Sequence, residues 1–118
     1  MAVYHIAYPA DWEQATESGE YRTSTRGVSL ERQGFIHCSD AHQVDLVANY
    51  VYRDDDGLIV LVIDPERLKA ELRYDEVPGS ADPYPHIYGP LNVDAVVGTL
   101  PLPKGADGTF SFTAGDAA

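Results

Sequence analysis

The sequence is poor in cysteine and in positive charge. Cys38 is the only cysteine among 118 residues, so an internal disulfide and a multi-cysteine zinc site are both excluded. Eight lysines and arginines stand against 19 aspartates and glutamates, which gives a formal net charge of −11. The arginines lie singly along the chain, and no basic patch is expected that would attract the phosphates of nucleic acid. We therefore expect no nucleic-acid partner.

Long apolar runs are also missing. None approaches the roughly 20 residues that a bilayer-spanning helix needs, and the first residues lack the basic region and apolar stretch of a secretory signal. We therefore expect no membrane partner and a cytoplasmic location. A composition of 44% hydrophobic and 23% charged residues is that of a globular protein. One domain over residues 1–118 is expected, with an ordered core over about 2–102 and a flexible, acidic, glycine-rich tail that has only Phe110 and Phe112 as anchors.

The common short motifs of nucleotide and hydrolase chemistry do not occur. The sequence contains no GxGxxG, GxxxxGK[ST], HExxH or GxSxG, so the dinucleotide, phosphate-loop, zinc-protease and hydrolase patterns have no support. Three histidines on predicted strands could bind zinc as neutral imidazoles, but their spacing is not diagnostic of a metal. We therefore assign no metal ligands, and a histidine metal site is kept only as an alternative function.

Hydrophobic periodicity predicts a mixture of short strands and short helices. Strands are expected over residues 2–8, 34–39, 58–63, 71–76, 86–91 and 95–102. Helices are expected over 10–17, 41–52 and 65–70, with one helical turn at 29–33 closed by Gly34. Residues 20–28 are expected to be loop or weakly extended chain, and 77–85 a loop rich in proline and glycine.

Strand alternation separates two sets of side chains in the segment GFIHCS. Phe35, His37 and Ser39 share one face, while Ile36 and Cys38 point to the other. We therefore expect His37 and Ser39 to face a site and Cys38 to be a small buried hydrophobe.

A helix N-terminus follows this strand directly. Either Ser39 or Asp40 can cap the helix expected over 41–52. The free N–H groups of its first turn would then favour a nearby phosphate or ribose oxygen.

Histidine can change its charge near neutral pH, so the strand histidines are candidates for acid–base or ligand-orienting work. These are His5, His37 and His86, which we expect to open onto one cleft. A hydrogen-bonded core histidine is the alternative for each of them. His42 lies in the first turn of a helix and is expected to be exposed.

Two further candidates, Glu76 and Tyr88, lie on either side of His86 in the sequence. Glu76 shares the predicted inner face with Leu72 and Tyr74, and a buried carboxylate needs a partner. It therefore either ends the strand in solvent or is held at a site. In the segment PHIYGP, two rigid turns would hold His86 and Tyr88 in fixed directions.

Several of these strings resemble a widespread bacterial family, the domain of unknown function family 952. The resemblance covers residues 3–102 and rests on YHIA at 4–7, GFIHCS at 34–39, VLVID at 60–64 and PHIYGPLNVDAVV at 85–97.

That family is similar to the ADP-ribosyltransferase-like fold. The resemblance implies an α+β architecture with two small curved sheets around a cleft that binds nicotinamide adenine dinucleotide (NAD), and a few short helices. It implies cofactor-binding roles for His5, His37, Ser39 and Tyr88. It implies catalytic roles for His37 and for His86 or Glu76 at the third position, which stays open.

Three functions follow as hypotheses. The first is an NAD-using protein, catalytic or formerly catalytic, of the ADP-ribosyl-transferring type. The second is a binding module for a small molecule or nucleotide without turnover, and the third is a histidine metal site. A glutathione-transferase architecture is not expected, because it needs a thioredoxin-like half and a helical half.

Overall fold

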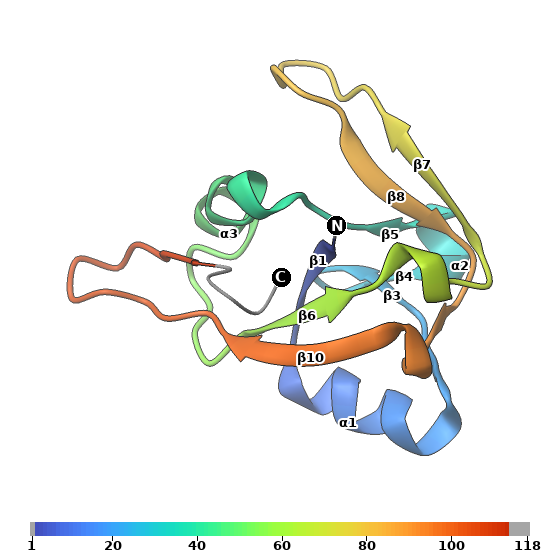
Figure 1. Cartoon of the computed structure of the whole chain (residues 1–118). Helices are drawn as coiled ribbons and strands as arrows, with labels where there is room; N and C mark the ends of the chain where they lie inside the picture. Colours follow the sequence, from blue (N-terminus) through green and yellow to red (C-terminus); the bar gives the residue numbers. More distant parts are fainter. Residues whose placement is uncertain (1, 114–118) are drawn as a thin grey trace.

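The continuous apolar run before Asp64 forms the central strand of the main sheet. The computed structural model describes residues 2–113. In it β6 (Ile59–Ile63) lies between β1 (Val3–Ala7) and β10 (Val96–Pro101), both antiparallel to it (Figure 1). Leu61 and Ile63 pack into one core cluster, and the alternate residues of β6 pack into a second. The strand is buried on both faces, as a run without polar residues predicts.

A second three-stranded sheet carries two of the candidate histidines. Its order is β5 (Ile36–His37), β8 (Tyr84–Tyr88) and β7 (Glu71–Asp75), with antiparallel pairing throughout. A pair of backbone hydrogen bonds between Tyr4 and Ser39 joins it to β1. The two three-stranded sheets therefore meet where β1 passes the end of β5.

Two short ladders complete the sheet structure of the described residues. β2 (Glu20–Tyr21) pairs with β9 (Leu91–Asn92), and β3 (Thr23–Thr25) pairs with β4 (Val28–Ser29). Residues 2–113 thus form four hydrogen-bonded groups of strands, where two sheets were expected. Of the two alternatives for residues 20–28, loop or weakly extended chain, the structure has mainly the extended one, because Thr23 and Thr25 pair with Ser29 and Val28 across a tight turn at Gly27, which has a φ of 67°.

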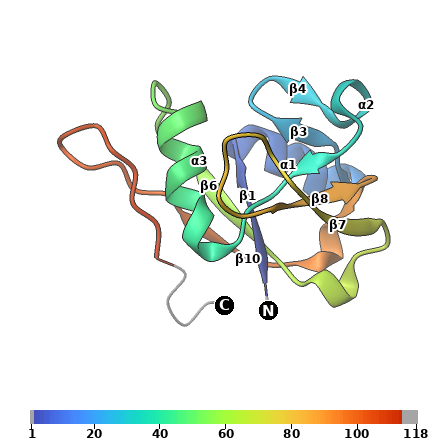
Figure 2. The ribbon, with the colours of Figure 1, turned by 90° about the horizontal axis from the view of Figure 1, so that it is seen from above.

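Helices cover the main sheet on both sides (Figures 1 and 2). Trp12 and Ala15 of α1 (Pro9–Ser18) pack against the core cluster that contains Leu61, whereas α3 (Val44–Val51) packs into the other cluster. Gly19 directly follows α1 and ends it in the left-handed conformation. None of the helices in the described part of the chain is long and apolar enough to cross a membrane.

The remaining helical segments are single turns. α2 (Leu30–Gln33) is ended by Gly34, as predicted, and Ser29, expected within the turn, caps it through its side chain instead. The 3-10 turns are η1 (Ala41–Gln43), η2 (Pro65–Arg67) and η3 (Val93–Ala95). The helix expected over 41–52 therefore begins as η1 and becomes α-helical only at Val44, and the helix expected over 65–70 is one 3-10 turn.

The chain stays packed beyond residue 102. Phe110 is buried in the second core cluster, and Phe112 packs edge to face on Tyr4. The side-chain amide of Asn49 holds the backbone of Phe110 through two hydrogen bonds. Both aromatic anchors expected in the tail thus hold it against α3 and β1, and residues 114–118 lie outside the described part.

Candidate functional site

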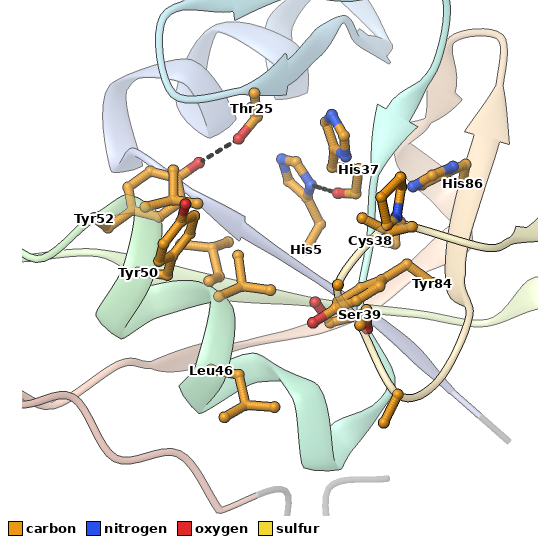
Figure 3. Close-up of a pocket in the computed structure, with 18 residues that line it drawn as sticks. His5, Thr25, His37, Cys38, Ser39, Leu46, Tyr50, Tyr52, Tyr84 and His86 are labelled. Carbon is orange, nitrogen blue, oxygen red and sulfur yellow. Dashed lines mark hydrogen bonds between the residues drawn. The ribbon is translucent and has the colours of Figure 1, made fainter.

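A pocket of about 810 Å³ opens where the two three-stranded sheets meet α3 and the loop after β7 (Figure 3). Seen from above, that loop reaches over the sheets toward α3 (Figure 2). His5, His37, Ser39 and His86 all line the pocket. Its other walls are mainly apolar or aromatic, among them Leu46, Val47, Tyr50, Tyr52, Val77 and Tyr84.

His5 has no free ring nitrogen. Its Nδ1 donates to the backbone carbonyl of His37 over 2.6 Å, because a carbonyl can only accept. Its Nε2 then accepts from the hydroxyl of Tyr21 over 2.8 Å. Burial lowers the pKa of His5 to about 4, which agrees with this neutral form. His5 therefore positions His37 and offers no hydrogen bond of its own to a ligand.

His37 and Ser39 are the polar groups with spare capacity. Within residues 2–113, neither the His37 ring nor the Ser39 hydroxyl makes a hydrogen bond, and burial together with the neighbouring His86 lowers the pKa of His37 to about 4. Ser39 is buried, and its backbone is paired with Tyr4. Both side chains line the pocket, as expected for residues that alternation places on one face.

His86 is held on one side and unpartnered on the other. Its Nδ1 lies 2.7 Å from Oδ2 of Asp75. Its ring stacks on Phe35 with centroids 4.1 Å apart and meets the His37 ring edge to face at 5.1 Å. Its Nε2 is buried and has no hydrogen-bond partner among the described residues. The ring is thus fixed in place while one nitrogen remains available.

The carboxylate beside His86 is Asp75, which the sequence assigns to a solvated face with Glu71 and Arg73. Arg73 lies opposite His86 in the β7–β8 ladder. Asp75, two residues further along the same face, is therefore the diagonal neighbour of His86. Hydrogen bonds from Tyr88 and His86 hold its pKa below the usual value.

Glu76 lies apart from the histidines. It follows the last residue of β7, is exposed, and lines a separate hollow with residues 77–83. Of its two sequence alternatives, the structure has the one in which the carboxylate ends the strand in solvent. Tyr88 does not line the histidine pocket either, and its hydroxyl donates to Asp75.

The helix start after Ser39 also lies outside the pocket. Residues 40–43 are absent from its lining, and the backbone N–H of Asp40 donates to the side chain of Gln43. The anion site expected at this helix start is therefore not part of the cavity. Ile36 and Cys38 are both buried, as predicted, and burial raises the pKa of the Cys38 thiol. Cys38 nevertheless lines the pocket beside His37, so the expectation that it lies behind the cleft is wrong; it directly follows β5, which ends at His37.

Sequence reasoning missed Asp75, Tyr84 and the α3 wall of the pocket. A hairpin register centred on the loop 77–83 would have placed Asp75 diagonally across from His86. Tyr50 gave only a weak signal in the sequence, as one aromatic residue in an apolar helix. In the structure its side chain is 86% exposed, which is unusual for a large aromatic residue. His42, expected to be exposed, lies on the surface near Asp82.

The described residues contain no group of three or more histidine, cysteine, aspartate and glutamate side chains arranged to hold a metal. Two imidazoles, His37 and His86, lie together in the pocket. What the pocket offers is a pair of neighbouring histidines, one of them backed by a carboxylate, above an apolar wall.

Comparison with known proteins gives a family. The family model for proteins of unknown function, DUF952, matches residues 6–99. A crystal structure of protein CC0527 from Caulobacter crescentus is similar, with 28% sequence identity and a TM-score of 0.81 over 99% of this chain and 97% of that one. A solution NMR structure of CC0527 gives a TM-score of 0.76 over 99% and 96% of the two chains at 28% identity. No match was found among curated proteins. Because the family model spans most of its length, this chain belongs to the DUF952 family.

Proposed function

We propose that the pocket binds NAD or a related nucleotide through its base and ribose. The observation that carries the proposal is a pocket of about 810 Å³ lined by His86, whose Nε2 is buried and has no hydrogen-bond partner within residues 2–113. Cavities of roughly 300–1,000 Å³ with apolar walls and a few convergent polar groups are typical of small-molecule sites. His37, Ser39 and His86 supply those polar groups here.

The walls suit a flat heterocycle. Tyr50 and Tyr52 lie on the α3 side of the pocket, and His37 and His86 lie across from them (Figure 3). A nicotinamide or adenine ring combines apolar faces with a few edge donors and acceptors, which match imidazole and hydroxyl groups. The likeness to the ADP-ribosyltransferase fold, which remains a prediction from the sequence, also favours NAD.

Charge limits the affinity. No lysine or arginine lines the pocket within the described residues, and the chain carries a net charge of −11. A pyrophosphate would therefore stay at the mouth in solvent, where water screens its charge. We expect affinity in the micromolar range or weaker, with most of the contact made by one base and its ribose.

Thermal stability measured with millimolar NAD, ADP-ribose and nicotinamide tests the proposal. A ligand at about 100 times its dissociation constant stabilises the fold by about 2.7 kcal/mol, and each kcal/mol raises Tm by about 4–8 °C in a small domain. His37→Ala should lose this shift. His42→Ala, which removes an imidazole outside the pocket, should keep it. Absence of any shift in the wild type, with calorimetry in agreement, would refute nucleotide binding.

A binding module without turnover is the second candidate. The observation that favours it is the lack of a carboxylate in the pocket lining of the described chain, since Glu76 faces solvent and Asp75 lies behind His86. Transfer of ADP-ribose would release nicotinamide, which chromatography detects directly. Binding of NAD with no nicotinamide released over hours would select the module, and release above the uncatalysed rate would select the enzyme.

The same charge argument applies to nucleic acid. With few cations to release counterions from phosphates, RNA and DNA should bind weakly even at low salt. A mobility-shift assay checks this, and a tight, salt-sensitive complex would reverse it and favour an RNA substrate.

A further inference from the structure

Asp75 and His86 form a hydrogen-bonded pair behind the pocket. The β7–β8 ladder makes them diagonal neighbours, and Nδ1 of His86 lies 2.7 Å from Oδ2 of Asp75. The hydroxyl of Tyr88 donates to the same oxygen, and the Arg73 guanidinium lies 4.7 Å from the centre of the Tyr88 ring. Two donors and a nearby cation keep the carboxylate ionised, in agreement with its lowered pKa.

This contact determines where the proton sits on His86. An ionised carboxylate only accepts hydrogen bonds, so Nδ1 must carry the hydrogen. A neutral imidazole then has its lone pair on Nε2. In the neutral form of the ring, the pair therefore makes Nε2 of His86 a fixed hydrogen-bond acceptor.

That acceptor has no partner in the described chain. Nε2 of His86 is buried, and a buried acceptor left unpaired costs free energy that a bound donor restores. Phe35 stacks on the imidazole and prevents it from turning toward another group. His37 packs on it edge to face, and no hydrogen bond within residues 2–113 holds the His37 ring in this orientation.

The donor must be uncharged. Within the described residues the pocket lining contains no lysine, arginine, aspartate or glutamate, so an ion would lose its hydration without gaining a partner. A hydroxyl or an amide N–H does not carry this penalty. We propose that the pocket selects ligands that present a neutral O–H or N–H donor to Nε2 of His86, and that Asp75 is the positioning residue that makes this nitrogen an acceptor.

This selection of neutral donors refines the proposed nucleotide function. It rests on that function only because both proposals use the same pocket. The experiment is two-bond 1H–15N NMR of the labelled protein, with the imidazole signals of His86 assigned from His86→Gln. The free protein should show a protonated Nδ1 and an unprotonated Nε2. Phenol should shift the Nε2 signal, whereas anisole, in which a methyl ether replaces the donor, should not.

Affinities for matched probes give the size of the effect. Phenol should bind about fivefold to tenfold more tightly than anisole, the factor expected for one hydrogen bond to a buried acceptor. Nicotinamide should be preferred to N,N-dimethylnicotinamide by a similar factor. Asp75→Asn should abolish both preferences, because its amide can donate to Nδ1 and move the ring hydrogen to Nε2. Tyr88→Phe keeps the carboxylate and should retain them.

The outcomes separate the two proposals. A proton on Nε2 in the wild type, or equal affinity for donor and methylated probes, would overturn the selection whether or not Asp75→Asn folds. Because phenol contains no part of a nucleotide, a response to phenol without one to NAD supports the selection and refutes only nucleotide binding. Stabilisation by NAD without any change in the Nε2 signal supports nucleotide binding and refutes the selection.

Discussion

Nδ1 of His5 donates a hydrogen bond of 2.6 Å to the backbone carbonyl of His37, 32 residues further along the chain. This bond ties β1 of the main sheet to β5 of the second sheet at the point where the pocket opens (Figure 3). The first strand histidine therefore holds the second in place. A residue that the resemblance assigns to cofactor binding acts in this structure as an internal support.

Removing His5 should destabilise the fold. His5→Ala leaves the Tyr21 hydroxyl and the His37 carbonyl without partners and opens a cavity in the core. We expect a loss of about 2–4 kcal/mol in the free energy of unfolding, measured by urea denaturation. The exposed His42→Ala should stay within about 0.5 kcal/mol of wild type. Equal stability of the two variants would contradict the supporting role of His5.

Mild acid should weaken the fold through the same residue. Burial lowers the pKa of His5 from 6.5 to about 4, so between these values the unfolded chain binds the proton that the folded chain excludes. The contribution of His5 is complete above about pH 6.5 and is lost as the pH falls to about 4. This contribution to the free energy of unfolding is on the order of 3 kcal/mol.

A comparison of variants isolates this contribution, because carboxylates also titrate in acid. Urea denaturation of wild type and His5→Gln at about pH 7 and about pH 4.5 should show a steeper decline in the wild type. Parallel declines would show that His5 does not carry the effect. His37, whose pKa is lowered in the same direction, should add to the slope in both proteins.

Cys38 should be chemically inert in the folded protein. It lines the pocket but is only 3% exposed, and burial raises the pKa of its thiol, so both access and thiolate are lacking. Ellman's reagent should react slowly under native conditions and release one equivalent of thiolate in denaturant. Rapid native labelling would show that the packing around β5 opens on the time scale of the assay.

Phe110 should contribute strongly to stability although it lies in the glycine-rich end of the chain. It is buried against α3, and Asn49 holds its backbone. Phe110→Ala should cost about 3–5 kcal/mol, measured by thermal or urea unfolding. Ser111→Ala next to it changes an exposed side chain and serves as the control. A neutral Phe110→Ala would mean that this segment does not pack in solution.

Local patterns in the sequence determined most of the secondary structure. Gly19 and Gly34 end their helices, Ser29 caps a turn, and the apolar run of β6 is buried on both faces. Each of these features depends on residues close in sequence. The glycines adopt a positive φ, the serine side chain caps a helical turn, and the apolar side chains of the strand leave water on folding. Alternation likewise predicted that His37 and Ser39 face one site, and both line the pocket.

Only the tertiary structure decided which groups meet. The choice of Asp75 over Glu76 depends on the register of β7 against β8, and a shift of one residue would exchange the faces of the two carboxylates. The pairing of both His5 nitrogens depends on Tyr21 and on a carbonyl 32 residues away. Strand period shows which side chains share a face. It does not show which distant strand supplies the partner, because that depends on how chain segments far apart in sequence pack together.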